Sequence, residues 1–195
     1  MARTIDRDAR KVQLAQAVWQ VILDRGISAV SVRTVAGQAG VVVGSLRHIF
    51  PTRAELLQFS AELMVQRATD RVLAVREGSD PAEYVLEVLK NFLPLTADSR
   101  AELEVNIALI AESPALPQLV CIRNRAYEEL GNACLRLTEK LACRPSDPEL
   151  IERARHLHAV LDGLAIHPLM EPLANDSAWA TVILEKELAR IVGNC

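Results

Sequence analysis

The side chains best suited to binding chemistry are basic residues near the N-terminus of this 195-residue chain. The whole chain has a formal net charge of −3. Residues 1–53 nevertheless hold eight lysines and arginines against three acidic residues, and the remainder holds 14 basic against 22 acidic residues. This division into a part with net charge +5 and a part with net charge −8 indicates a polyanionic partner that contacts the N-terminal part alone.

Signals for other kinds of chemistry are weak. The sequence contains no recognisable nucleophile–base pair, glycine-rich phosphate loop or metal-binding motif, so we expect no cofactor and no enzyme activity. His158 and Asp162 are four residues apart and could share a metal ion, but two ligands do not make a site. The cysteines lack zinc-ligand spacing, and we expect reduced thiols that act as small buried hydrophobic groups, with a redox-sensing pair as the alternative. They are Cys121, Cys134, Cys143 and Cys195.

Composition favours an all-α fold. Half of the residues are hydrophobic but aromatic residues make up only 4%, a balance that suits packed helices better than sheets. No stretch approaches the roughly 20 apolar residues that a membrane span needs. The first eleven residues lack the apolar core of a secretory signal. We therefore expect a cytoplasmic protein without a membrane partner.

Two short helices are predicted on either side of Gly40. The apolar residues of each segment recur at the i, i+3 and i+4 spacing of one helical face. They are Val32, Val35 and Ala36 in the first segment and Leu46, Ile49 and Phe50 in the second. Gly40 can adopt a left-handed backbone at little steric cost. The pattern predicts a helix-turn-helix whose second helix enters the DNA major groove; these residues alone leave an ordinary helical hairpin open as the alternative.

Local stop and cap signals bound the helices around this pair. A first helix is predicted over residues 7–25 after a loose arm, and a long fourth helix over residues 52–78. Glycine and proline mark the ends, and serine and threonine mark the N-caps. These signals fall at Gly26, Ser31, Gly40, Pro51 and Thr52.

Five further helices are predicted beyond residue 80, which brings the total to about nine. Asp147 and Pro148 are expected to begin the fourth of these five as N-cap and first helical residue. In the second, Leu103, Ile107 and Ile110 are expected to face inward. The expected ranges are 84–92, 99–112, 117–143, 148–168 and 177–192.

The first 60 or so residues resemble TetR-family transcriptional regulators. The resemblance rests on a series of residues that follow the family's order and spacing without gaps: Gly26, Ser31, Ala39-Gly40-Val41, the run 44–50 (GSLRHIF), Thr52, Arg53 and Glu55-Leu56. The stretches 100–105 (RAELEV) and 161–165 (LDGLA) resemble the regulatory half of the same family. The resemblance implies a DNA-binding domain over residues 1–51 and a helical regulatory and dimerisation domain over residues 52–195.

Two positions depart from the family pattern. The serine or threonine that usually opens the recognition helix is replaced by Val42 and Val43, and the usual tyrosine is Arg47. A guanidinium can donate to phosphate through two N–H groups, and a valine can contact a thymine methyl. Gly44 would allow close approach of the backbone to DNA. The predicted DNA-contacting set is Arg33, Val42, Val43, Gly44, Ser45, Arg47, His48, Thr52 and Arg53.

The last two helices are predicted to form a homodimer interface. The segment from residue 157 to residue 170 is apolar nearly all round, which exceeds what one subunit's core needs. A two-fold pair would also match a palindromic operator. The alternative is that these residues only complete the core of the subunit. The predicted interface consists of Leu157, Val160, Leu161, Leu164, Trp179, Val182 and Ile183.

The family resemblance also implies a pocket for a small-molecule effector inside the helical body. Its candidate lining is Phe59, Leu63, Met64, Phe92, Leu103, Asn106, Ile107, Arg123, Tyr127, His158 and Leu164. The predicted function is a ligand-responsive repressor that binds double-stranded DNA as a homodimer and is released when an effector tilts helix 52–78. The alternatives are a helical ligand-binding or protein-interaction module without DNA binding, and a helical-bundle enzyme.

Overall fold

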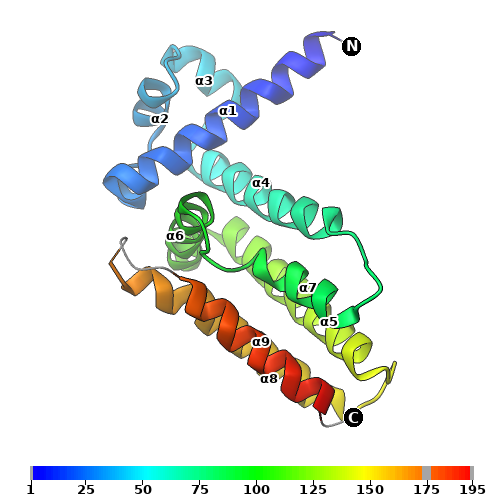
Figure 1. The fold of residues 1–195 in the computed structure, drawn as a ribbon. Helices are drawn as coiled ribbons and strands as arrows, with labels where there is room; N and C mark the ends of the chain where they lie inside the picture. The colour runs from blue at the N-terminus through cyan, green and yellow to red at the C-terminus, as the bar shows by residue number, and fades with distance from the viewer. Residues whose placement is uncertain (1, 173–176, 194–195) are drawn as a thin grey trace. The chain divides into compact units, whose positions relative to one another are not determined.

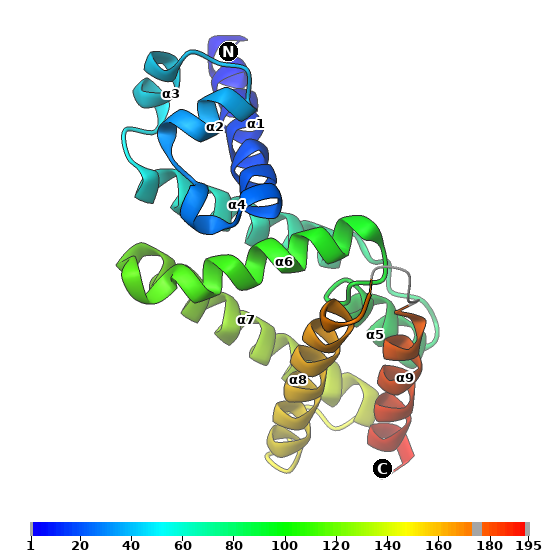
Figure 2. The same cartoon turned by 90° about the vertical axis from the view of Figure 1, so that its left-hand side faces the viewer.

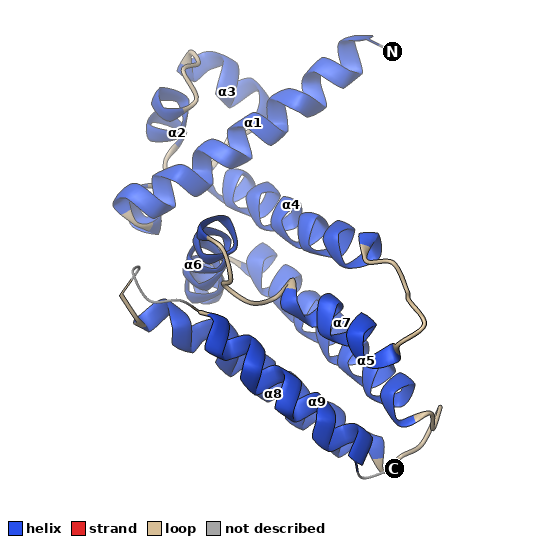
Figure 3. Ribbon diagram, in the orientation of Figure 1, coloured by secondary structure: helices blue, strands red, loops and turns tan. Residues whose placement is uncertain are grey.

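The computed structural model describes residues 2–172 and 177–193, with side chains from Asp8 onward. In these ranges the regular structure consists of nine α-helices and three short 3-10 helices (Figure 3), as the all-α prediction requires. The α-helices are α1 (Ala2–Arg25), α2 (Val32–Gln38), α3 (Val43–Ile49), α4 (Arg53–Ala74), α5 (Pro81–Lys90), α6 (Ala97–Glu112), α7 (Pro117–Ala142), α8 (Leu150–Ile166) and α9 (Ala178–Gly193). The 3-10 helices are η1 (Ile27–Ala29), η2 (Ser113–Ala115) and η3 (His167–Met170).

The chain forms two compact units that do not follow one cut in the sequence. Unit 1 contains the residues up to Arg67 together with Glu104–Asn124. Unit 2 contains Ala68–Leu103 and the residues from Arg125 onward. Three helices, α4, α6 and α7, therefore contribute to both units. The predicted domain boundary at residue 51 stays a prediction.

Glycine and a capping box set the boundaries between α1 and α2 in unit 1. Gly26 has a φ of 78° directly after the last residue of α1, as its role as a stop signal predicts. Ser31 is the N-cap of α2, and its Oγ accepts a hydrogen bond from the Thr34 amide at 3.1 Å. The Ser31 amide donates in turn to Oγ1 of Thr34 at 2.9 Å. This reciprocal pair satisfies two amides at the start of α2.

The turn between α2 and α3 depends on Gly40, which has a φ of 65°. Directly after it, the Val41 amide donates to the Ala36 carbonyl oxygen at 2.9 Å and closes the turn. The chain leaves α3 through Phe50 and Pro51, and Oγ1 of Thr52 accepts from the Glu55 amide at 3.2 Å at the start of α4. Figure 1 shows α2 and α3 joined by this turn, with α1 beside them. The predicted helix-turn-helix is therefore confirmed.

The core of unit 1 joins α1, α2 and α3 to α4 and to the unit 1 parts of α6 and α7. Trp19 on α1 is buried, and its Nε1 donates to the Ser60 carbonyl oxygen on α4 at 3.3 Å. The fully buried side chains include Leu14, Val18, Val35, Leu46, Leu56 and Leu57. Burial of several large aliphatic groups, each worth about 1.5–3 kcal/mol, makes this a packed support for the short helices.

The core of unit 2 brings α5, α8 and α9 together with the unit 2 part of α7. Helix α9 packs against both α5 and α8, and Figure 2 shows α8 and α9 running side by side. The most deeply buried side chains are Val85, Leu89, Cys134, Leu157, Leu161 and Leu184. Within the described part of the chain, no helix is both long and apolar enough to span a bilayer.

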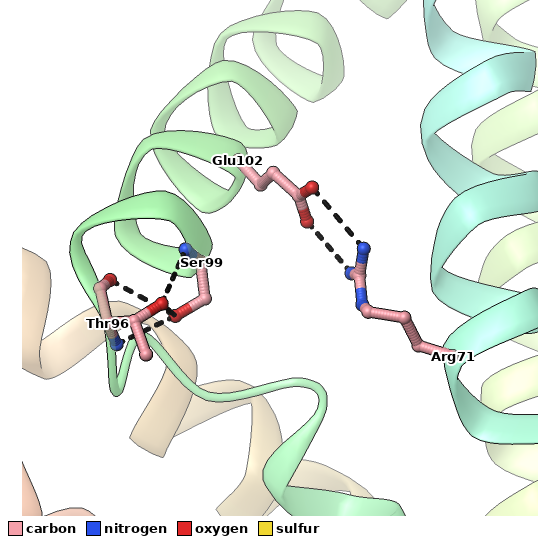
Figure 4. Close-up of polar contacts among 4 residues, drawn as sticks. All are labelled: Arg71, Thr96, Ser99 and Glu102. Atoms are coloured by element: carbon pink, nitrogen blue, oxygen red, sulfur yellow. Dashed lines mark hydrogen bonds and ion pairs between the residues drawn. The ribbon is translucent and has the colours of Figure 1, made fainter. Parts of the chain in front are cut away.

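Polar contacts hold the beginning of α6 within unit 2 (Figure 4). Nη1 and Nη2 of Arg71 on α4 donate to the two carboxylate oxygens of Glu102 at 3.3 and 2.8 Å. Thr96 and Ser99 form a reciprocal cap, in which each amide donates to the hydroxyl oxygen of the other residue. Arg100 donates to three carbonyl oxygens in and after η3, those of Pro168, Leu169 and Glu171.

Several predicted helix boundaries are wrong. Helix α1 already begins at Ala2, so residues 2–6 are not a loose arm. Helix α4 ends at Ala74 rather than near residue 78. Helix α8 begins at Leu150 rather than at Pro148, because Asp147 caps a turn in front of the helix: its Oδ1 accepts from the Glu149 amide at 2.9 Å.

Two predictions about burial are also wrong. Ile110 is 44% exposed, and the fully buried residues of α6 are Val105 and Leu109. The thiols of Cys121 and Cys143 are free and exposed, so only Cys134 among the described cysteines matches the expectation of burial. Cys195 lies outside the described residues.

Candidate nucleic-acid interface

Helix α3 has an apolar side that faces the unit 1 core and a polar side that faces solvent. Leu46 is fully buried, and Val43 and Ile49 pack partly buried against the same core. The residues between them, at the complementary helical positions, are exposed: Gly44, Ser45, Arg47 and His48. A helix presented in this way offers a hydroxyl, a guanidinium and an imidazole on a single face, groups that can contact phosphates and base edges.

The N-terminal end of α3 carries Val42 and Val43 in place of the serine or threonine that is usual in the family pattern. Val42 is the N-cap, with an extended backbone, and its side chain is 75% exposed. Valine has no side-chain oxygen with which to cap the first turn, and the Ser45 amide donates instead to the Val42 carbonyl oxygen at 3.0 Å. Val43, by contrast, directs its side chain toward the core, so of the two valines Val42 is the one accessible to DNA.

The short helices are held by hydrogen bonds as well as by packing. Nε2 of Gln13 on α1 donates to the Ala39 carbonyl oxygen, at the end of α2, at 3.4 Å. Oγ1 of Thr34 donates to the Ala29 carbonyl oxygen at 2.7 Å. Arg33 lies on the same helix as Thr34 with its side chain exposed, which leaves it accessible as a phosphate contact.

The two predicted phosphate contacts at the start of α4 differ in their surroundings. Thr52 is exposed and caps α4. Arg53 donates to the carbonyl oxygens of Ile27 and Val30 and to the carboxylate of Glu112. Three of its N–H groups are therefore occupied by partners within unit 1.

The predicted effector-pocket residues are divided between the two units. In unit 1, Met64 is buried in the core and the Phe59 ring lies 5.2 Å from the Phe50 ring. Nη1 of Arg123 donates to Oγ of Ser113 at 2.8 Å. Three further unit 1 residues are half-buried: Leu63, Asn106 and Ile107. In unit 2, Leu164 is buried in the core, and Phe92 and Leu103 are half-buried.

The remaining two pocket candidates are in contact within unit 2. The ring of Tyr127, on α7, lies 4.9 Å from that of His158, on α8, and Tyr127 is 64% exposed whereas His158 is 7% exposed. Nε2 of His158 lies 3.8 Å from Oδ2 of Asp162. Burial raises the pKa of the Asp162 carboxyl, opposed by the charge of His158. Burial, with a contribution from Asp162, also raises the pKa of the Cys134 thiol to about 12.

The predicted dimer-interface residues fall into two groups. Leu157, Leu161 and Leu164 are buried in the unit 2 core, and Val160 and Trp179 pack partly buried against it. Val182 and Ile183 on α9 are 46% and 43% exposed. Other exposed aliphatic residues on α8 and α9 are Ile151, Ile166 and Val192.

Sequence reasoning missed several residues that hold these elements in place. Thr34 completes the capping box of α2, and the spacing Ser31-x-x-Thr34 could have suggested it. The ion pair between Arg71 and Glu102 joins residues 31 apart in the sequence, and no local pattern points to it. Likewise, no local pattern points to the three carbonyl partners of Arg100, which lie 68 or more residues away in the sequence.

Comparison with protein families supports the same reading of both halves of the chain. Residues 14–58 match the family of bacterial regulatory proteins designated tetR, a range that covers the second half of α1, the short helices α2 and α3 and the start of α4. Residues 81–193 match the C-terminal domain of BetI-type transcriptional repressors.

Individual relatives agree with these matches. The chain is 34% identical over 176 residues to the HTH-type transcriptional regulator PksA of Bacillus subtilis, an alignment that covers 89% of this chain and 85% of the relative. It is 25% identical over 190 residues to the regulator BetI 2 of Chromohalobacter salexigens, with 94% and 88% covered.

Solved structures show the same fold. A transcriptional regulator from Rhodococcus sp. Rha1 has a TM-score of 0.83 at 27% identity, with 94% of this chain and 96% of that chain covered. A regulator from Saccharomonospora viridis, solved in complex with choline, has a TM-score of 0.82 at 21% identity, with 93% and 96% covered. The chain therefore belongs to the TetR family of DNA-binding transcriptional regulators, which are not enzymes, and its C-terminal part is of the BetI repressor type.

Proposed function

We propose that this repressor binds a palindromic operator as a homodimer and leaves it when a small-molecule effector binds. The observation that carries the DNA-binding part is the exposed polar side of α3 on a packed three-helix support. We propose that Ser45, Arg47 and His48 contact bases and phosphates in the major groove. Arg33, Val42, Gly44 and Thr52 complete the proposed contact set, with Val43 as an internal support.

The proposed dimer uses the exposed sides of α8 and α9. Leu157, Leu161 and Leu164 are taken up by the subunit's own core, so the exposed Val182 and Ile183 are the stronger candidates for contact with a partner. Exposed aliphatic residues on two adjacent helices favour burial against a second copy. The same two helices also line a charged groove, in which the buried Glu187 carboxylate lies 3.1 Å from Nε2 of His156 and 2.9 Å from Nη1 of Arg190.

The proposed effector site lies in unit 2 at Tyr127, His158 and Asp162. The exposed Tyr127 ring lies against His158, which in turn lies 3.8 Å from the Asp162 carboxylate, and an aromatic ring with a carboxylate in the same cluster favours a cationic or polar organic ligand. The complex of the Saccharomonospora viridis regulator with choline supports this class of ligand and makes choline a reasonable first probe. The pocket residues assigned to unit 1 have less support, because Met64 and Arg123 are engaged in packing and hydrogen bonding.

Selection from sheared genomic DNA tests the proposal. Fragments retained by the wild-type protein are footprinted, and we expect two protected blocks related by two-fold symmetry, with centres about one helical turn or a multiple of it apart. Choline added to the complex is expected to release the DNA, and Asp162→Asn is expected to reduce that response. A single protected block would contradict the dimer, and retention of no fragment would contradict DNA binding. A choline titration without effect would exclude choline as the effector.

A further inference from the structure

The guanidinium of Arg53 joins parts of unit 1 that are distant in the sequence. Arg53 is the first residue of α4, and its Nε and Nη2 donate to the carbonyl oxygens of Val30 and Ile27, both at 3.0 Å. Its Nη1 lies 2.7 Å from Oε1 of Glu112, the last residue of α6. The planar guanidinium thus makes bonds in three directions, which a lysine ammonium on its flexible stem cannot reproduce.

The two carbonyl groups belong to the turn in front of α2. Ile27 begins η1, and Val30 follows it directly before the Ser31 cap. Helix α2 packs against α3, and α4 follows α3 in the chain. The bonds from Arg53 therefore tie the beginning of the helix-turn-helix to the helix that leaves its end.

Glu112 is itself held in place at the end of α6. The next residue, Ser113, is fully buried, and its hydroxyl donates to the Ile110 carbonyl oxygen at 2.7 Å. The same hydroxyl accepts from Nη1 of Arg123 on α7 at 2.8 Å. The side chains of Arg53 and Glu112 are 33% and 22% exposed, so solvent screens their attraction less than that of a fully exposed pair.

We propose that Arg53 is a positioning residue for DNA binding, which acts through Glu112 and the turn before α2 rather than through a phosphate. The orientation of α3 then depends on a carboxylate at the end of α6 that makes no contact with DNA. This role predicts that loss of the Glu112 carboxylate weakens DNA binding. Charge alone predicts the opposite, since removal of a negative charge near a DNA-binding surface should strengthen binding. This role of Arg53 rests on the DNA-binding part of the proposed function. It does not depend on dimer formation or on effector binding.

Two conservative variants, Glu112→Gln and Arg53→Lys, test the proposal. Glutamine removes the charge at nearly constant size, and lysine keeps the charge but loses the three-way geometry. We expect each variant to bind a duplex selected by the wild-type protein about tenfold more weakly, with an unchanged dependence of affinity on salt. The double variant should bind no more weakly than either single variant, because the two substitutions remove the same interaction, the one between Arg53 and Glu112.

Glu62→Gln is the matched control, since it removes the same charge from α4, where the carboxylate accepts from Gln58, while Arg53 keeps its partners. Its affinity is expected to stay unchanged or to rise slightly. Hydrogen–deuterium exchange adds a readout that needs no DNA: amides of residues 27–38 should exchange faster in both test variants, with the unit 2 core unchanged. A general loss of stability would instead accelerate exchange throughout the chain.

Three results would overturn the proposal. One is a Glu112→Gln variant that binds the duplex as tightly as the wild-type protein. Another is an Arg53→Lys variant that keeps wild-type affinity, as a simple phosphate contact would. The third is unchanged exchange over residues 27–38. A wild-type protein that retains no duplex would contradict the proposed function instead, and the exchange measurement would still decide the role of Arg53.

Discussion

At the scale of single residues, the exposed side of α3 carries the groups that we propose contact DNA. Ser45, Arg47 and His48 lie on that side, whereas Leu46 anchors the helix from the other. Arg47 occupies the place where the family usually has tyrosine. A guanidinium adds a full positive charge and two parallel donors at this position. We therefore expect electrostatics to contribute a larger share of the DNA-binding energy than it would with a tyrosine here.

Arg47→Ala should therefore weaken binding to a selected operator and flatten its salt dependence. Each lost phosphate contact lowers the slope of log affinity against log salt by about one, so we expect a decrease of about one per subunit. Fluorescence anisotropy at several salt concentrations measures this. Arg136→Ala, an exposed arginine on α7, is the control and should leave the slope unchanged. An unaltered slope in Arg47→Ala would show that Arg47 does not contact phosphate.

At the scale of helices, the short α2 and α3 depend on the turn that joins them. Both helices have seven residues, too few to be stable alone. Their directions are fixed by the left-handed backbone at Gly40 and by burial of Val35 and Leu46. A Cβ atom at Gly40 would meet nothing within 4 Å, so any cost of a side chain there comes from the backbone and not from a clash.

Gly40→Ala should destabilise the protein by about 1 kcal/mol, because an L-residue resists a positive φ. Gly37→Ala is the matched control: Gly37 lies within α2, where a Cβ also meets nothing within 4 Å. There, alanine should stabilise by up to about 1 kcal/mol, through its helix propensity and the reduced freedom of the unfolded chain. Urea unfolding curves of the three proteins measure both effects. Equal effects of the two substitutions would contradict the role assigned to Gly40.

Local chemistry explains which helix boundaries could be predicted from the sequence. Gly26, Ser31 and Thr52 act on their immediate neighbours, so the ends that they mark agree with the structure within one residue. Helix α6 has apolar residues around its circumference, so spacing alone could not identify Val105 and Leu109 as its buried side.

The same distinction between local and distant signals applies to the candidate site. The exposed side of α3 follows from helical periodicity within seven residues. The partners of Arg53 lie 23, 26 and 59 residues away. Such hydrogen bonds depend on tertiary packing, which the local sequence does not show. An arginine can donate to a phosphate or, equally well, to two carbonyl oxygens and a carboxylate, so the residue type alone could not identify the partners of Arg53.

At the scale of the whole molecule, charge is divided unevenly along the sequence. The basic excess lies in residues 1–53, whereas the rest of the chain is acidic. Exposed aliphatic side chains lie on α8 and α9, among them Ile166, Val182 and Ile183. An acidic body is repelled by DNA, so binding is directed to the basic part, and the apolar residues of the last helices remain available for a second subunit.

Ile183→Glu should convert the proposed dimer into a monomer, since it places a charge in the interface. Ile183 is 43% exposed, so the subunit itself should remain folded. Sedimentation velocity measures the change, and affinity for a palindromic operator should fall with it. Leu73→Glu is the control, because Leu73 on α4 is 76% exposed and lies outside α8 and α9. A dimeric Ile183→Glu variant would exclude α9 as the interface.

The three helices shared by both units limit how this protein can be recombined with its relatives. No single loop separates the units, because α4, α6 and α7 each pass from one to the other. A chimaera with a foreign DNA-binding part would need junctions in register inside helices, since one inserted residue turns all that follows by about 100°. Exchanging residues 1–51 alone would also pair a foreign turn with the native Arg53 and Glu112, so operator preference cannot be transplanted without its supporting residues.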